Sequence, residues 1–285
     1  MIHLFVNLCL ILTCLSGGVA IDLKITQSEL QQFVNTIWRL EKTKVDFRTN
    51  FWIDLQGKLA EGASMDMAPG PLFQLWTSPF SNTIPAFMDL LDNYHWSVGI
   101  KEQMSSKEQK EVETFLSELM KTETMKQTFA FLRNKGLNVR TEEDFKQMLK
   151  SIWFTLYSRK RVNDSSAFEH VFVGEKRGRE ISGLHNWIRF AQMEKAGMLD
   201  YRGFFTTNCG NPPLLVTISF VTHDGAVKSK GSLLIGTSPE FEFALYTTVF
   251  TGGRSTVTVK LDSCRITVRC YSLHKTDTMG TCFII

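Results

Sequence analysis

The hydrophobic pattern of this chain changes its period near residue 160. Before that point, apolar residues recur three and four positions apart, which places them on one face of an α-helix. After it, short runs rich in β-branched and aromatic residues alternate with clusters of Gly, Asn and Asp, as in antiparallel strands joined by turns. The change predicts an α+β fold, with a helical N-terminal half packed on an antiparallel β-rich C-terminal half.

The helical half carries three apolar stripes, each preceded by a start signal. We predict one helix capped by Ser28, with Gln31 completing a capping box. A second begins after Ser105 with Glu108, and a third follows Thr141. Capping side chains satisfy backbone N–H groups that the first helical turn leaves without partners. The stripes themselves are expected to face the core rather than a cofactor.

The β-rich half is predicted to hold several strands and one helix. The helix runs from about Gly183 to Ala196, with Ser182 as its N-cap and Gly197 as its stop. The predicted strands cover residues 171–173, 214–221, 232–235, 256–261 and 266–271.

Residues 1–20 have the pattern of a secretory signal peptide. The apolar run from Phe5 to Leu15 is followed by small residues and is too short to span a bilayer. We therefore expect a secreted protein without a transmembrane segment. Its mature domain, residues 21–285, would comprise a mainly helical lobe, residues 21–160, and a β-rich catalytic lobe, residues 161–285.

Export also bears on the cysteines and on one asparagine. Four cysteines remain after residue 20, and an even number in an exported chain predicts up to two disulfides, with all three pairings left open. These are Cys209, Cys264, Cys270 and Cys282. Asn163 begins an Asn-Asp-Ser glycosylation sequon. No CxxC pair occurs, so we place no metal site.

Two histidines lie where acid/base chemistry is feasible. His170 falls in a run predicted as a strand, on the same face as two phenylalanines, and His185 falls in the first turn of the predicted helix. The helix dipole is expected to lower the pKa of His185, and the neighbouring Glu169 and Glu175 to raise that of His170. A pair separated in this way can supply one base and one acid near neutral pH. Two purely structural histidines are the alternative.

Two imidazoles and an ammonium group suffice to cleave RNA by transesterification. One imidazole removes the proton of a ribose 2′-OH, which attacks the adjacent phosphorus, and the other protonates the leaving 5′-oxygen. A lysine stabilises the charge that develops on the phosphoryl oxygens. Lysines are numerous, and Lys228 and Lys230 both lie in a predicted turn ahead of a β-run. A net charge of +3 permits a polyanionic partner without requiring one.

Three segments resemble the EndoU family, which includes XendoU and placental protein 11. They are the stretches from Phe168 to Glu175, from Ser182 to Phe190 and from Ile235 to Tyr246. The resemblance implies an EndoU-like fold and an endoribonuclease that cuts single-stranded RNA at uridines, leaving 2′,3′-cyclic phosphate ends and sparing DNA. We further expect a monomer without an organic cofactor.

The resemblance also assigns roles to individual residues. His170, His185 and Lys228 fall on the family's catalytic positions. Ser232 matches a hydroxyl position that helps to select uracil, and Tyr271 matches a tyrosine that packs by the ribose or base.

Glu169 and Glu175 fall on acidic positions that relatives need for activity, and we group them with the substrate-binding residues. Members of the family often respond to Mn²⁺. Such an ion is expected to act through RNA phosphates or through the acidic residues near His170. The chain departs from the family pattern at Cys270, where relatives usually have Thr, and in the tail, residues 281–285.

Two other classes of function compete with this one. The altered C-terminal strands are compatible with a protein that binds RNA or another polyanion on the same fold with weak catalysis. Cys209 beside Asn208 suggests a hydrolase of another class, with a cysteine nucleophile, as the third hypothesis. No Gly-x-Ser-x-Gly elbow or local cysteine-protease signature accompanies these residues.

Overall fold

A computed structural model describes residues 23–42, 51–62, 65–76, 81–273 and 278–285 of the 285-residue chain. The predicted signal peptide, residues 1–20, lies outside these ranges. Within them, no helix combines the length and the apolar character needed to cross a membrane.

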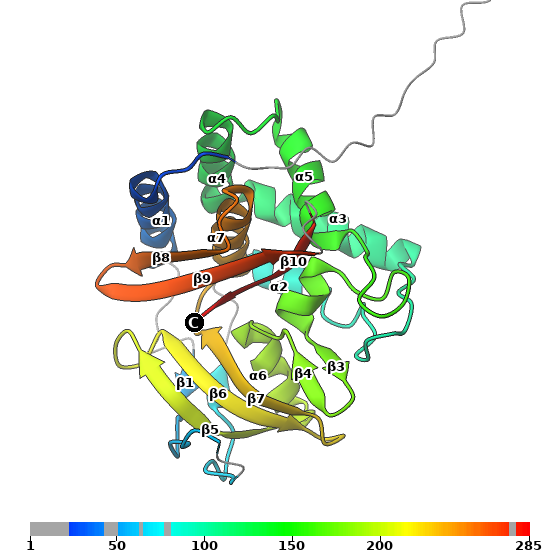
Figure 1. Ribbon diagram of the computed structural model, residues 1–285, viewed down its shortest axis with the longest axis vertical. Coiled ribbons are helices and arrows are strands. Elements are labelled where there is room, and N and C mark those ends of the chain that lie inside the picture. Colours follow the sequence, from blue (N-terminus) through cyan, green and yellow to red (C-terminus); the bar gives the residue numbers. More distant parts are fainter. Residues whose placement is uncertain (1–22, 43–50, 63–64, 77–80, 274–277) are drawn as a thin grey trace, which may run out of the picture.

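One body of the molecule is a bundle of helices that surrounds a central helix from the C-terminal half (Figure 1). The central helix, α7, is buried on all sides, which accounts for its apolar sequence without a polar face. The sequence predicted only one helix after residue 160 and missed α7, because a segment that is apolar all round shows no amphipathic period. The bundle comprises α1 (Gln27–Lys42), α2 (Thr83–Met88), α3 (Ser106–Lys121), α4 (Glu123–Asn134), α5 (Glu142–Phe154) and α7 (Pro239–Thr251).

A three-stranded antiparallel sheet of order β10-β9-β8 lies on this bundle. Its strands are β8 (Thr256–Leu261), β9 (Cys264–Ser272) and β10 (Met279–Ile284). Burial alternates along all three strands, so one face packs against α7 and the other is partly exposed. The strand predicted at 256–261 is confirmed with its bounds, and the one predicted at 266–271 lies within β9.

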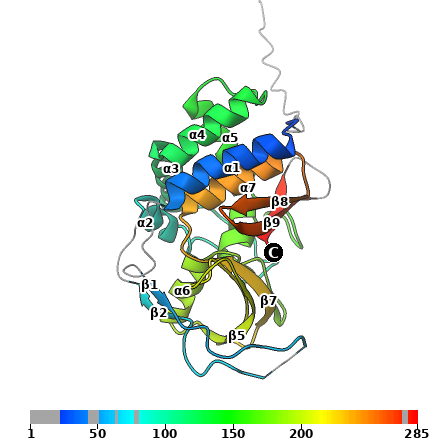
Figure 2. The same cartoon turned by 90° about the vertical axis from the view of Figure 1, so that its left-hand side faces the viewer.

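The second body is a five-stranded sheet of order β3-β4-β7-β6-β5. Figure 2 shows this sheet curving around α6 (Trp187–Lys195), with β1 (Phe51–Ile53) and β2 (Phe73–Trp76) beside it. Both bodies therefore contain segments from both halves of the chain. The strands are β3 (Glu175–Arg177), β4 (Glu180–Ser182), β5 (Leu199–Asn208), β6 (Leu215–Thr222) and β7 (Val227–Leu234). The α+β prediction is confirmed, although β5 was not predicted.

The helix starts agree with the sequence in two of four cases, and α6 is capped by Asn186 and not by Ser182. Capping boxes are formed by Ser105, with Glu108, and by Thr141, whose partner is Asp144. The first helix begins earlier than predicted, because Thr26 and not Ser28 caps it. The Glu29 backbone N–H donates to the Thr26 hydroxyl, and the Glu29 carboxylate accepts from the Thr26 backbone N–H at 2.9 Å.

The segment predicted as a strand around His170 is instead a π-helical turn, η1 (Glu169–Val173). Phe168 and Phe172 are four residues apart, so a helical turn places them on one side, where both are fully buried. Phe172 stacks on Phe243 of α7 with ring centroids 5.1 Å apart. A spacing of four residues satisfies both a strand and a helix, which explains the wrong prediction. This aromatic packing anchors the turn that carries His170.

Two disulfides settle the pairing that the sequence left open. Cys209 bonds to Cys264, which ties the end of β5 to the start of β9 and so joins the two sheets. Cys270 bonds to Cys282 across the paired strands β9 and β10. The first bond leaves Cys209 without a free thiol, which excludes this residue as a cysteine nucleophile.

Candidate active site

Backbone hydrogen bonds bring the two predicted histidines together. The Leu184 N–H donates to the His170 carbonyl at 3.0 Å, and the His185 N–H donates to the Val171 carbonyl at 2.8 Å. The contact is close at Gly183, which has φ +65° and where an added Cβ would lie 1.7 Å from the His170 oxygen. Only glycine fits there. The loop after β4, residues 183–185, therefore packs directly against η1.

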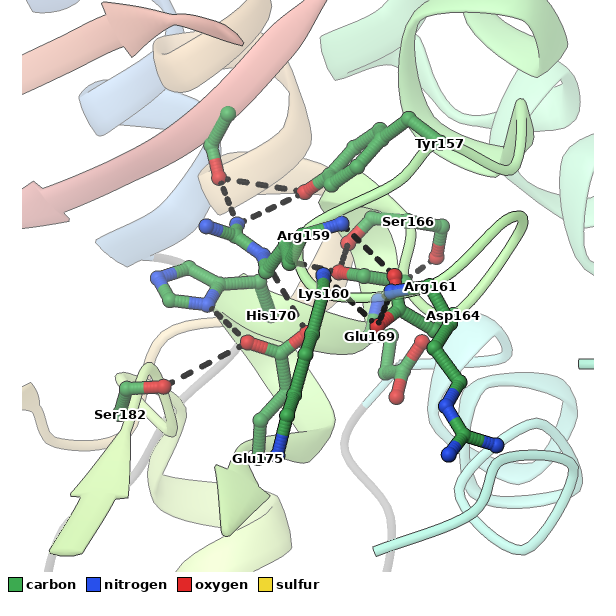
Figure 3. Close-up of polar contacts among 12 residues, drawn as sticks. Tyr157, Arg159, Lys160, Arg161, Asp164, Ser166, Glu169, His170, Glu175 and Ser182 are labelled. Carbon is green, nitrogen blue, oxygen red and sulfur yellow. Dashed lines mark hydrogen bonds and ion pairs between the residues drawn. The ribbon is translucent and has the colours of Figure 1, made fainter. Parts of the chain in front are cut away.

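His170 is held by a buried carboxylate on the neighbouring strand. Its Nδ1 lies 2.6 Å from Oε2 of Glu175, and Figure 3 shows these two groups pointing at each other. The other oxygen of Glu175 lies 3.3 Å from Nε of Arg159. The Ser182 hydroxyl donates to Glu175 at 3.4 Å. Nδ1 of His170 is therefore occupied, and Nε2, which has no partner among the described residues, is the atom that can exchange a proton.

The charge balance of this cluster differs from the sequence prediction. Burial lowers the pKa of His170, the bond to Glu175 raises it, and the net shift is downward. Burial raises the pKa of Glu175, but the hydrogen bond to His170 and the positive charges beside it bring it below its ordinary value. Glu175 is thus an anion that favours the imidazolium form of His170, although it does not outweigh desolvation.

Glu169 does not act on His170 as the sequence predicted. Its carboxyl group is almost completely buried, and burial followed by the charge of Glu175 raises its pKa to about 10. It is therefore neutral near pH 7. In Figure 3 its side chain points away from the His170 ring, and its Oε2 has no hydrogen-bond partner. Of the two acidic residues, only Glu175 contacts the imidazole.

His185 lies ahead of helix α6 rather than in its first turn. Asn186 is the N-cap, and its side chain accepts from the Arg189 N–H at 3.0 Å. The pKa of His185 is lowered well below its ordinary value, as predicted, but the causes are burial and then the nearby charges of Lys228 and His170. The backbone hydrogen bonds of Leu184 and His185 to η1 place the two histidines next to each other.

The structure separates Lys228 from Lys230, which the sequence placed together in a turn. Both lie in strand β7. The pairing with β6 passes from Phe220–Lys228 to Ile218–Gly231, so β7 carries one extra residue there. Such a bulge redirects side chains. Nζ of Lys228 donates to the Gly183 carbonyl at 2.7 Å, whereas that of Lys230 lies 2.6 Å from Glu61.

Lys228 is buried beside the two histidines. Burial lowers the pKa of its ammonium group to about 8. The group therefore remains mostly charged near pH 7 and loses its charge more readily than an exposed lysine.

Of the two residues predicted to contact the uridine, Ser232 lies beside His185 and Tyr271 lies on the sheet that carries Phe283. The Ser232 backbone forms a hydrogen bond with His185, and the Ser232 hydroxyl lies 3.0 Å from that of Thr217. Tyr271 is 44% exposed and pairs with Thr281 across β9 and β10. It shares the face of that sheet that carries Phe283, whose ring stacks on His185.

The sequence missed Arg159 and Phe283. Arg159 connects the site to β10, because its guanidinium donates to the Gly280 carbonyl at 2.5 Å while its Nε faces Glu175. It lies in a basic run, residues 159–161, that could have been noted. Phe283 has no sequence signal, since a tail phenylalanine resembles any apolar strand residue.

The acidic residues near His170 do not form a Mn²⁺ site. Over the described part of the chain, no three His, Cys, Asp or Glu side chains are grouped as metal ligands. Glu169 is neutral, and Glu175 is already bound to His170 and Arg159. A hard cation needs several charged or carbonyl oxygens, and these two groups do not supply them.

The site as a whole is a cluster of two imidazoles and one ammonium group, in which His170 and Lys228 are buried and His185 is partly buried. Nδ1 of His170 is bound to Glu175 while its Nε2 has no partner among the described residues, the lowered pKa of His185 keeps its imidazole neutral, and Lys228 supplies positive charge. This set can move two protons and stabilise an anionic intermediate without a metal ligand from the protein.

Comparisons with known proteins identify relatives over most of the chain. Residues 29–284 match the family described as endoribonuclease XendoU. The chain is 39% identical to uridylate-specific endoribonuclease C of Danio rerio over 251 residues, covering 82% of this chain and 81% of that protein. It is 38% identical to the poly(U)-specific endoribonuclease of Xenopus tropicalis over 237 residues, with 78% and 80% covered.

A solved structure has the same fold. The structure of XendoU, described as a splicing-independent snoRNA-processing endoribonuclease, aligns with a TM-score of 0.78 and 34% sequence identity. The alignment covers 90% of this chain and 96% of the other.

Proposed function

The chain belongs to the XendoU family of endoribonucleases, and on that premise we propose that it cleaves single-stranded RNA at uridines by attack of the ribose 2′-OH. The observation that supports this reaction most directly is the hydrogen-bonded contact between the η1 turn and the Gly183–His185 loop. It brings His170 and His185 next to each other, and Lys228 donates to the Gly183 carbonyl of the same loop. The products would carry a 2′,3′-cyclic phosphate and a free 5′-OH.

His185 is the general base in this proposal. Its pKa lies well below the ordinary value, so its imidazole is neutral and able to accept the 2′-OH proton. His170 is the general acid, because Glu175 stabilises its imidazolium form through Nδ1 and leaves Nε2 to protonate the departing 5′-oxygen. Each step of this kind contributes roughly 100- to 10000-fold to the rate.

Lys228 supplies the third function. Its buried ammonium group stabilises the negative charge that grows on the phosphoryl oxygens, an effect that is larger in a site with little water. Ser232, next to His185, and Tyr271, on the sheet face that carries Phe283, are the proposed contacts to the uridine. DNA lacks the attacking hydroxyl and is expected to remain intact.

Cleavage of matched oligonucleotides tests the proposal. Substrates that differ only in one base, uridine or another, are incubated with the purified protein and with His170→Ala, and the product ends are analysed. Cyclic-phosphate ends at uridine, lost in His170→Ala, are expected. Binding without turnover in the wild type would instead support the alternative of an RNA-binding protein, and cleavage of the all-deoxy substrate would contradict attack by the 2′-OH.

We also propose that the protein is exported and monomeric. The signal-like N-terminus and the two disulfides support export. Asn163, the sequon residue, lies in a turn with its side chain partly exposed. Recovery from medium of a chain that begins near residue 21, its mass shift on deglycosylation and its mass in solution test these points.

A further inference from the structure

The outer face of the β8–β9–β10 sheet has an unusual charge distribution. The inner face is apolar and packs on α7, so the outer face comprises every second residue of each strand. It contains three cations and no carboxylate. Its residues are Thr256, Thr258 and Lys260 on β8, Arg265, Thr267, Arg269 and Tyr271 on β9, and Thr281 and Phe283 on β10.

The three cations follow one direction away from the catalytic histidine. Phe283, which stacks on His185, pairs directly with Arg269. Two positions farther along β9 the face carries Thr267, and two farther still Arg265, which pairs with Lys260 on β8. Four residues of extended strand span roughly 13 Å, which is longer than one nucleotide.

These cations have no partner that neutralises them. Among the described residues, no carboxylate forms an ion pair with Lys260, Arg265 or Arg269, and Nε of Arg269 is buried without a hydrogen-bond partner. The side chains of Lys260 and Arg265 are exposed. By contrast, Lys42 beside the same hairpin is paired with Asp262 at 2.9 Å. The sheet face therefore carries unpaired positive charge that starts next to His185. Such a row of charges attracts a polyanion.

We propose that this outer sheet face binds the nucleotides on one side of the scissile phosphate, with Arg269, Arg265 and Lys260 contacting successive phosphates. The proposal rests on the proposed function, since it takes the cleaved strand as the occupant. This charge pattern favours single-stranded RNA. The sugar–phosphate backbone of a single strand can follow the sheet surface through its phosphates, which leaves the bases free to stack or to face solvent. The threonine hydroxyls between the cations add hydrogen-bond partners for ribose and phosphate.

The test measures cleavage of short and of extended substrates by the wild type and by the double variant Lys260→Ala/Arg265→Ala. Three oligonucleotides share one central uridine site: a trinucleotide, the same extended by five nucleotides on the 5′ side, and the same extended on the 3′ side. Wild type is expected to gain in kcat/KM from extension on one side only. The variant is expected to lose roughly tenfold on that extended substrate and nothing on the trinucleotide.

Salt dependence provides a second readout. Each phosphate contact on a single strand contributes about 0.7 to the slope of log affinity against log salt, so removing two contacts lowers the slope by about 1.4. Lys110→Ala/Lys126→Ala removes the same charge from exposed positions on α3 and α4 and serves as the matched control. Both variants alter exposed side chains, and equal thermal midpoints verify that they are folded.

The possible results separate the two proposals. Failure of wild type to cut any of the three substrates would overturn the proposed function. Cleavage by wild type with no effect of the variant on either extended substrate, or an equal effect on both, would overturn the sheet-face proposal and leave the catalytic one intact. The same loss in the Lys110/Lys126 control would also overturn it, because the effect would then come from net charge.

Discussion

The ring of Phe283 stacks on the imidazole of His185, with centroids 4.9 Å apart and planes inclined by 16°. Strand β10 thereby covers one side of the proposed general base with an apolar surface. The contact removes water from that side of the ring and restricts its rotation. It also makes the tail, where the chain departs from the family pattern, a part of the candidate active site.

Phe283→Ala is expected to alter the acid/base behaviour of His185. Because burial is the main cause of its lowered pKa, exposing one ring face raises the pKa towards the ordinary value, and the base becomes protonated at higher pH. The acid limb of kcat/KM should move to higher pH, and kcat should fall about tenfold. Phe283→Leu keeps the face covered and should retain the wild-type limb. A loss of activity with an unmoved pH profile would show that the ring acts only in folding.

Glu175→Gln removes the carboxylate that favours the imidazolium form of His170. The pKa of His170, already lowered by burial, should fall further, so less of the general acid is protonated. We expect kcat to drop roughly 100-fold or more and the alkaline limb of kcat/KM to move to lower pH. Glu180→Gln, an exposed change in the adjacent strand β4, is the control. Wild-type rates in Glu175→Gln would exclude the assigned role.

The wild-type pH profile follows from the directions of these shifts. Both histidines have pKa values below the ordinary 6.5 in the free protein. Since the acid must be protonated, kcat/KM should reach its maximum below pH 6.5 and decline as pH rises. Lys228, with a pKa of about 8, should add a second decline as it loses its charge.

Bound phosphate changes this balance. Its negative charge stabilises imidazolium, so the maximum of kcat should lie at higher pH than that of kcat/KM. Rate measurements from pH 4 to 9 on one short substrate compare the two maxima. A maximum of kcat/KM above pH 7.5 would contradict the assigned shifts.

Gly183→Ala and Gly178→Ala form a matched pair. Both glycines have positive φ, +65° and +63°, so alanine is strained in either position, by about 1 kcal/mol. Only at Gly183 does the new Cβ collide with backbone, the His170 carbonyl, whereas nothing lies within 4 Å at Gly178. Gly183→Ala should therefore abolish cleavage and lower the thermal midpoint much more than Gly178→Ala. Equal effects of the two would mean that the η1 contact is not needed.

The two disulfides should separate stability from activity. Cys209–Cys264 closes 55 residues and Cys270–Cys282 closes 12, so chain entropy predicts losses of about 4 and 3 kcal/mol on removal. The second bond clamps the strand that carries Phe283. In denaturation experiments, the Cys209→Ser/Cys264→Ser variant should lose more stability than the Cys270→Ser/Cys282→Ser variant. In kinetic measurements, the Cys270→Ser/Cys282→Ser variant should lose more of its kcat. The reverse order in kcat would argue against a clamping role.

Parts of this fold follow from local patterns alone. The caps at Ser105 and Thr141 and the strand at 256–261 were predictable because capping and alternation depend on residues a few positions apart. The η1 turn, helix α7 and strand β5 were not. The spacing of Phe168 and Phe172 fits both a strand and a helix, and α7 has no polar face that would reveal a helical period. Only the packing around Phe243 decides which secondary structure forms.

The candidate site shows the same division. Recognisable segments indicated His170, His185 and Lys228 by residue type. The sequence named Glu169 and Glu175 alike, and it could not tell that only Glu175 contacts the imidazole while Glu169 is buried and neutral. Lys228 and Lys230 are equally close in sequence, and a bulge in β7 sends them to different partners.

The sequence by itself determined the fold class and the family and indicated the three groups of the proposed reaction, because these depend on residue identity and short-range spacing. The tertiary structure alone decided their protonation and geometry. Burial, the Glu175 contact and the stack of Phe283 on His185 join η1, the Gly183 loop, β7 and β10, which are far apart in the chain. A pKa depends on the distances to charges and to solvent, and these distances exist only after the segments have packed.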